Sequence, residues 1–244
     1  VGWGAPSGVT AAYLAREGFT GAPALTCEGE GAAPFWADLG NRWLLVDHTH
    51  YKPYPCCRWA HPSIDAAHDL MKSNGLRADE IESVEIRTFH NATRLAGHEP
   101  KTMDEFAYSI AFPVAAMIVR GQVGVAEMRV ETLSDPDILR ISRATVLIDD
   151  PELTARSVGK RWAAVTLKTT DGRIFADAAR SPRGDTDMPL SDAEISAKYH
   201  LFADPVLGRA RADRVEELSG RFDTLEAKEF AELMGLVTSK ASVA

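Results

Sequence analysis

The sequence has little of what marks membrane proteins, nucleic-acid binders or disulfide-bonded secreted proteins. No apolar run reaches the roughly 20 residues that a transmembrane helix requires, so we expect no membrane association. The formal net charge of -8 argues against nucleic acid as a partner, because phosphate binding requires a concentrated basic face. The number of cysteines is odd and two of the three are adjacent, so a disulfide framework is not expected. Free cysteines fit the reducing cytoplasm, which is the location that we expect. Residues 1–8 carry no basic segment, so we expect no signal peptide.

Apolar periodicity predicts helices toward both ends of the chain. A helix over 62–73 has a proline in its first turn, where the missing amide costs nothing. The longest predicted helix covers 104–120, with Asp104 as its N-cap and a kink at Pro113. The other predicted helices cover 6–18, 33–39, 135–142, 192–202, 209–219 and 226–236.

Alternation of apolar and polar residues predicts strands in the middle of the chain. The turn Asp171-Gly172 joins the last two strands as a hairpin. Residues 180–190 are rich in polar residues, proline and glycine, and are predicted to form a loop. We therefore expect an α+β fold. The predicted strands cover 81–89, 144–148, 162–169 and 174–176.

Reactive side chains are concentrated in residues 48–61, which read HTHYKPYPCCRWAH. Three of the seven histidines and two of the three cysteines lie in this segment, beside Lys52 and Arg58. Three kinds of site fit these residue types: a metal site, a thiol nucleophile and a cationic pocket for an acid. An acidic protein can hold such a pocket, because the local potential can be positive.

Spacing disfavours two of these three interpretations without excluding them. Zinc sites favour pairs such as Cys-x-x-Cys, whereas Cys56 and Cys57 are adjacent and their side chains diverge. A nucleophilic thiol needs a neighbouring base, and no local His-Asp pair accompanies the cysteines. In the third interpretation Lys52 and Arg58 bind a carboxylate, while His61 transfers protons or has a structural role at the start of the next helix.

The segment KPYPCCRxxHPxIDAA, from Lys52 to Ala67, resembles the signature of the MmgE/PrpD family. This family includes 2-methylcitrate dehydratase and cis-aconitate decarboxylase. The similarity extends over the full chain. Further similar stretches are GVTAAYLAREGFTG at 8–21, IESVEI at 81–86, AYSIAF at 107–112, and RGD, PLS and KY at 183–185, 189–191 and 198–199.

The resemblance implies a mainly helical domain, a smaller α+β domain with an antiparallel sheet, and C-terminal helices that return to the helical domain. We expect residues 1–71 to end the helical domain and carry the active-site segment. Residues 72–178 would form the small domain, and 179–244 the returning loop and helices. Family members are considerably longer, so we expect this chain to be a C-terminal half completed by an N-terminal-half polypeptide in a dimeric assembly. A truncated or clipped product is the competing explanation.

The resemblance also implies acid–base chemistry without a cofactor on di- or tricarboxylic acids. Lys52 matches the site lysine of the family and is assigned carboxylate binding or proton transfer, and His61 is the second catalytic candidate. No metal is expected. The substrate-binding candidates are Arg58, Cys57, Phe112 and Arg183. The tripeptide Arg183-Gly184-Asp185 is interpreted as ordinary loop chemistry.

We expect a hydro-lyase that removes an α-proton and expels a β-hydroxyl group from an acid such as 2-methylcitrate. Decarboxylation is disfavoured because Cys57 and Phe112 stand where the decarboxylases have a histidine and a tyrosine. The alternatives are an isomerase or epimerase, a decarboxylase of a related dicarboxylate, and a non-catalytic structural or regulatory subunit.

Overall fold

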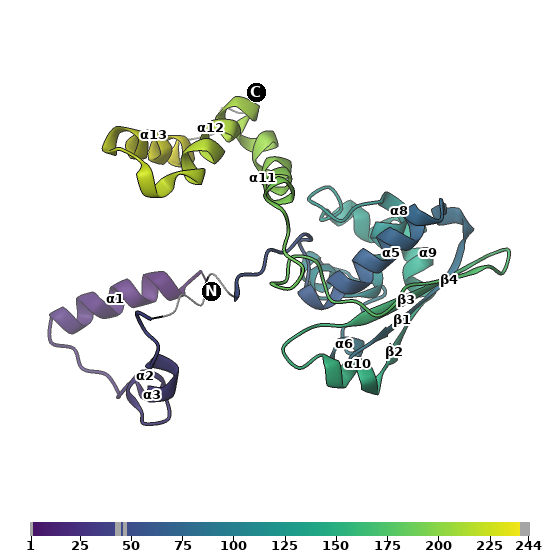
Figure 1. Cartoon of the computed structure of the whole chain (residues 1–244), viewed down its shortest axis with the longest axis horizontal. Helices are drawn as coiled ribbons and strands as arrows, with labels where there is room; N and C mark the ends of the chain where they lie inside the picture. The colour runs from purple at the N-terminus through teal and green to yellow at the C-terminus, as the bar shows by residue number, and fades with distance from the viewer. Residues whose placement is uncertain (1, 42–44, 46–47, 240–244) are drawn as a thin grey trace. The chain divides into compact units, whose positions relative to one another are not determined.

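The computed structural model describes residues 2–41, 45 and 48–239, and the chain divides into two compact units, Val1–His48 and Thr49–Ala244 (Figure 1). The domain boundaries predicted after residues 71 and 178 stay predictions. The described helices of the first unit are α1 (Gly4–Arg16), α2 (Leu25–Glu28) and α3 (Ala33–Trp36). The first of these confirms the helix predicted over 6–18, and α3 is shorter than predicted.

The first unit has almost no interior in its described part. Ala32 is its one buried residue there. The apolar side chains that give α1 its helical periodicity, Val9 and Tyr13, are 59% and 57% exposed, and Phe35 of α3 is 83% exposed. Exposed apolar surface of this extent is typical of a segment that packs against another protein surface.

The second unit is built on a mixed sheet, four-stranded in the described residues, with the order β2-β1-β3-β4. β1 is antiparallel to β3, and β3 to β4, but β1 and β2 are parallel. The expected α+β class is confirmed, with one parallel pair in the sheet. That pair is parallel because several helices lie between the two strands and carry the chain back to the starting edge. The strands are β1 (Ile81–Thr88), β2 (Thr145–Asp149), β3 (Ala163–Thr169) and β4 (Ile174–Ala176).

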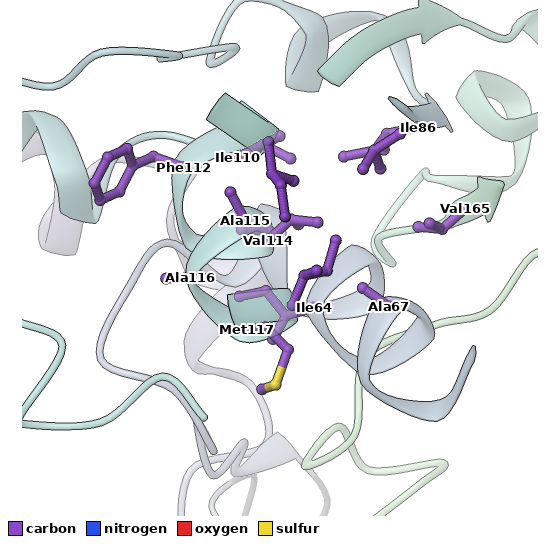
Figure 2. Close-up of a cluster of buried hydrophobic side chains, with 14 of the residues drawn as sticks. Ile64, Ala67, Ile86, Ile110, Phe112, Val114, Ala115, Ala116, Met117 and Val165 are labelled. Atoms are coloured by element: carbon purple, nitrogen blue, oxygen red, sulfur yellow. The ribbon is translucent and has the colours of Figure 1, made fainter. Parts of the chain in front are cut away.

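Helices α5 (His61–Ser73), α8 (Ala111–Arg120) and α9 (Pro136–Arg143) pack together and against the sheet (Figure 1). Figure 2 shows Ile64 of α5 and Val114 of α8 facing Ile86 and Val165 of the central strands. All four side chains are fully buried, and each contributes on the order of 1.5–3 kcal/mol by leaving water. This core holds the start of α5, and with it the end of the reactive segment, in a fixed place.

The helix predicted over 104–120 is wrong, because the chain breaks at Tyr108–Ile110 into α7 (Met103–Ala107) and α8. The amides of Ile110 and Ala111 donate to the carbonyl oxygens of Leu95 and Ala96 at 2.8 and 2.9 Å, so contacts distant in sequence replace helical hydrogen bonds.

Two details of that predicted helix are also corrected. The N-cap of α7 is Thr102, whose Oγ1 accepts from the Glu105 amide at 3.1 Å, and not Asp104. Pro113 is the third residue of α8, where its missing amide breaks no helical hydrogen bond, so the expected kink has no cause.

The predicted helices toward the C-terminus are confirmed as α11 (Asp192–Leu207), α12 (Arg209–Gly220) and α13 (Ala227–Thr238). Val215, Leu218 and Leu233 form a small separate core between α12 and α13. Among the helices that the structure describes, none combines the length and the apolar character needed to cross a membrane. Short elements of the second unit that periodicity did not predict are α6 (His90–Thr93), α10 (Pro151–Arg156), η1 (Arg58–Ala60), η2 (Ala78–Glu80), η3 (Val130–Ser134) and η4 (Phe222–Thr224), and α2 is unpredicted in the first unit.

Candidate active site

The loop over 180–190 docks on the reactive segment and fixes its backbone. The amide of Tyr51 donates to the carbonyl oxygen of Gly184 at 3.0 Å. Gly184 has a φ of +85°, and a Cβ at this position would lie 1.8 Å from the carbonyl oxygen of Tyr51. Glycine alone combines this left-handed conformation with so close an approach. Two segments far apart in sequence are therefore held backbone to backbone.

Asp185, the next residue of this loop, holds two basic side chains of the reactive segment. Its Oδ2 accepts from Arg58 Nη2 at 2.6 Å, and its Oδ1 lies 2.9 Å from His50 Nδ1. The Asp185 side chain is 4% exposed, and those of Arg58 and His50 are 25% and 33% exposed. A carboxylate this deeply buried requires such partners. No pattern in the sequence predicted a role for Asp185, although its tripeptide lies within the family resemblance.

Arg183, a predicted substrate-binding residue, is held by a second buried carboxylate. Its backbone amide and its Nε donate to the two oxygens of Asp65, each at 3.1 Å, and its Nη1 donates to Glu194 at 2.8 Å. Tyr54 Oη donates to Asp65 Oδ1 at 2.7 Å, and burial together with the Asp65 charge raises the pKa of Tyr54. The guanidinium of Arg183 thus binds the 180–190 loop to α5 through Asp65. A contact between Arg183 and the substrate stays a prediction.

His61 and Cys56 form the buried floor of the reactive segment. The His61 ring packs edge-on against Tyr54, and its Nε2 lies 3.3 Å from the carbonyl oxygen of Cys56. Burial lowers the pKa of His61 to about 4, so the ring is neutral at pH 7 and donates to this carbonyl. Burial raises the pKa of the Cys56 thiol to about 12, so this thiol is not a nucleophile. The burial of His61 favours its structural alternative, and its proton transfer stays a prediction.

Lys52 is the exposed cation of the segment. Its ammonium group makes no hydrogen bond or ion pair with any residue that the structure describes. Its carbonyl oxygen accepts from Lys198 Nζ at 2.5 Å, which ties the backbone to α11. The Lys52 charge also acts on the Cys56 thiol and on the His61 ring. The structure thus presents an available ammonium group on a backbone fixed from two sides.

Comparison with known proteins shows to which family this chain belongs. The model of the MmgE/PrpD C-terminal domain matches residues 54–224. The chain belongs to the MmgE/PrpD family. It is 21% identical to the cis-aconitate decarboxylase-like protein oryM of Aspergillus oryzae, over 97% of this chain and 53% of that protein. It is 23% identical to cis-aconitate decarboxylase of Mus musculus, over 93% of this chain and 49% of that protein. The chain spans about half the length of these curated relatives.

Two of the substrate-binding candidates of this MmgE/PrpD chain, Cys57 and Phe112, differ in how deeply they are buried. Cys57 is half-buried, and its amide donates to the carbonyl oxygen of Ala107 at the end of α7, at 2.7 Å. Phe112 is fully buried in the core, edge-on to Phe106 with the ring centroids 5.3 Å apart (Figure 2). Lys52, Cys57 and Arg58 share one segment of the sequence, whereas Phe112 of α8 is enclosed in the hydrophobic core.

Within the described residues, no cluster of three or more His, Cys, Asp or Glu side chains suits a metal ion. His50 is engaged by Asp185, and His48 belongs to the other unit of the chain. The site was expected to be cationic, and Lys52 and Arg58 are the charges that the reactive segment presents. A third cation, Arg161, lies outside this segment, and sequence analysis did not single it out.

Proposed function

We propose that this chain forms one wall of the active site of a lyase that acts on a small di- or tricarboxylic acid. The observation that carries the proposal is a Lys52 ammonium group without a partner among the described residues and an Arg58 guanidinium held by buried Asp185, both close enough for their charges to act on His61. Two cations of this kind suit a carboxylate, because Asp185 holds the Arg58 guanidinium in place before the ligand arrives and the Lys52 ammonium group is available to bind it. The named relatives support the substrate class, since cis-aconitate is a tricarboxylate.

The leading chemistry is dehydration. A base removes the proton α to one carboxylate, and the β-hydroxyl group leaves as water. The α-proton is weakly acidic, so the negative charge that develops on the carboxylate must be stabilised by nearby cations. Lys52 takes this role or transfers the proton, and Arg58 binds a carboxylate. His61 supports the backbone beneath them through the Cys56 carbonyl group.

Decarboxylation is the second candidate, and the names of the two relatives favour it. Loss of CO2 from the same acids also leaves negative charge beside a carboxylate, so the same cations would serve. The resemblance argues against this chemistry at Cys57 and Phe112. Analysis of the products distinguishes the two, since decarboxylation releases CO2 and dehydration releases water.

An isomerase or epimerase would need only the abstraction of the α-proton. Incubating candidate acids with the active assembly in deuterated water tests this alternative. Deuterium incorporation into the recovered acid without loss of water or CO2 would favour an epimerase over a lyase.

We also propose that a second structural half completes the site, because the chain spans about half the length of its relatives. The first unit exposes its apolar helix faces, and α11 bears an open groove of about 530 Å³. The lining of this groove is almost entirely apolar, which fits a helical partner surface and not an acid. Its residues are Tyr51, Ile195, Lys198, Tyr199, Phe202, Ala203, Val206 and Leu207.

The missing half is either a separate N-terminal-half polypeptide or the remainder of a longer chain, and we propose a dimeric assembly by resemblance. Mass spectrometry of purified active material tests the partner. Full activity with this chain as the only polypeptide would overturn the need for a second half.

The substitution Lys52→Ala tests the catalytic proposal. In the active assembly we expect a loss of kcat/KM of about 10²-fold or more, the usual range for a group that stabilises charge or moves a proton. Lys72→Ala, at an exposed lysine in the last turn of α5, is the matched control and should leave the rate unchanged. A loss of less than tenfold for Lys52→Ala would favour the alternative of a non-catalytic subunit.

A further inference from the structure

Arg161 lies just before β3, beside two aromatic rings. Its guanidinium carbon is 5.6 Å from the ring centroids of both Trp59 and Phe89, and these rings pack edge-on with their centroids 5.3 Å apart. Trp59 follows Arg58 directly in η1, so Arg161 adjoins the cationic segment of the candidate active site. Aromatic faces on one side and backbone on the other limit where this guanidinium can move.

One edge of the Arg161 guanidinium is engaged and the other is not. Nη1 donates to the carbonyl oxygens of Ser157 and Lys160. Nε is buried without an acceptor, and Nη2 has none among the described residues. Nε and Nη2 form the side-on edge with which arginine binds a carboxylate through two parallel hydrogen bonds. Buried donors are normally paired, so the empty edge points to a ligand.

Arg161 is one of the residues that line a cavity of about 330 Å³. The volume lies at the lower end of ligand pockets, which suits a small acid. No acidic side chain lines the cavity, so nothing in its wall would repel an anion. Its one other ionisable lining residue, His90, is paired with Asp149 at 2.6 Å. The lining residues are Trp59, Phe89, His90, Asn91, Thr154, Ser157, Val158, Gly159 and Arg161.

Positive charge around the cavity exceeds the available negative charge. Burial and the charge of Arg58 lower the pKa of Arg161, while Asp185 acts in the opposite direction. Asp185 is already bound to Arg58, and the Nε of Arg58 is also buried without an acceptor. Lys160, the next cation, is paired with Asp187 at 2.6 Å. A carboxylate beside Arg161 would relieve the repulsion between the two guanidinium groups.

We propose that the Nε/Nη2 edge of Arg161 binds one carboxylate of a small polycarboxylic acid in this cavity, with Trp59 and Phe89 packed against its carbon chain. The identification of this polycarboxylic acid as the substrate rests on the proposed function. The site then selects acids with at least two carboxylates, one for Arg161 and one for Arg58, whose charge acts on Arg161. An acid with a single carboxylate occupies only one of the two positions.

Arginine side-chain NMR on this chain tests the site without an activity assay. The indole N–H of Trp59, which lines the cavity, reports binding in the unsubstituted chain and in every variant. The probe is tricarballylate, a tricarboxylate without a hydroxyl group, titrated to 50 mM, and in the unsubstituted chain the Nε–H signal of Arg161 is also observed. We expect a saturable shift of both signals and a loss of affinity of about tenfold or more in Arg161→Gln. Arg161→Lys keeps the positive charge but cannot make the bidentate hydrogen bonds, so this variant should bind tricarballylate with intermediate affinity. Arg173→Gln, at an arginine paired with Asp171 on the β3–β4 hairpin, is the matched control and should bind as the unsubstituted chain does.

The outcomes separate this site from the proposed lyase function. An unshifted Arg161 signal at 50 mM, or unchanged affinity in both Arg161 variants, overturns the site even if Lys52→Ala abolishes activity. A saturable shift of the Trp59 indole signal that Arg161→Gln weakens or removes supports the site, even if Lys52→Ala leaves activity intact and the lyase proposal fails. Arg161→Lys decides the matter should Arg161→Gln not fold.

Discussion

Gly184→Ala perturbs the contact that docks the 180–190 loop on the reactive segment. The new Cβ would lie 1.8 Å from the carbonyl oxygen of Tyr51, and real Cβ contacts are essentially never closer than 3.0 Å. The opposing atom belongs to the backbone and cannot rotate away, so the loop must withdraw by more than 1 Å. Asp185 is the next residue along the chain and must move with it.

The expected cost is the sum of three local losses. A left-handed alanine costs about 1 kcal/mol. Loss of the hydrogen bond from the Tyr51 amide costs about 1 kcal/mol, and displacing Asp185 from Arg58 costs about 1–2 kcal/mol more, reduced because Arg58 is partly exposed. We therefore expect the free energy of unfolding to fall by about 3–4 kcal/mol.

Gly172→Ala is the matched control, because Gly172 has a φ of +88° and no atom within 4 Å of the position where a Cβ would lie. It should lose about 1 kcal/mol from the left-handed conformation alone. Urea unfolding followed by circular dichroism measures both variants, and hydrogen exchange at the Tyr51 amide reports the loop directly. Equal losses for the two variants, with the Tyr51 amide still protected, would refute the importance of this close approach.

Two further predictions follow from the pKa values in the reactive segment. Because the folded-state pKa of His61 is lowered to about 4, protonation favours unfolding, and about 3 kcal/mol of stability is lost as the pH falls from about 6.5 to 4. His61→Gln should remove this part of the acid sensitivity. His68→Gln is the control and should not, because His68 is a half-exposed surface histidine. If urea unfolding at a series of pH values gives the same pH dependence of stability for both variants, His61 is not the source of the acid sensitivity. A thiol reagent at pH 8 should label exposed Cys27 and half-buried Cys57 in the native chain and reach Cys56 only after denaturation, so rapid labelling of Cys56 would contradict its burial.

Sequence alone predicted the elements whose signals are local. The helix over 62–73 and the strand over 81–89 were recognised because their apolar residues repeat at the spacing of a helix or a strand face. The cationic character of the reactive segment could also be read from Lys52 and Arg58, because charge is a property of the residue itself. The family followed from the Lys52 to Ala67 motif and is confirmed by the match over 54–224.

Features that depend on contacts between distant residues could not be predicted in this way. The break between α7 and α8 exists because the amides of Ile110 and Ala111 donate to the carbonyl oxygens of residues 95 and 96. No local sequence pattern predicts hydrogen bonds of this kind. Periodicity favoured a continuous helix there, since it records only which faces are apolar.

The composition of the site shows the same division. The sequence places Lys52 and Arg58 on one segment, but only the tertiary structure brings Asp185 and Arg161 close to Arg58 from loops far along the chain. Isolated charged residues in loops give no signal of their own, because most of them are simply solvated. Their role appears only when folding buries the Asp185 carboxylate against two side chains, Arg58 and His50, and leaves one edge of the Arg161 guanidinium without an acceptor.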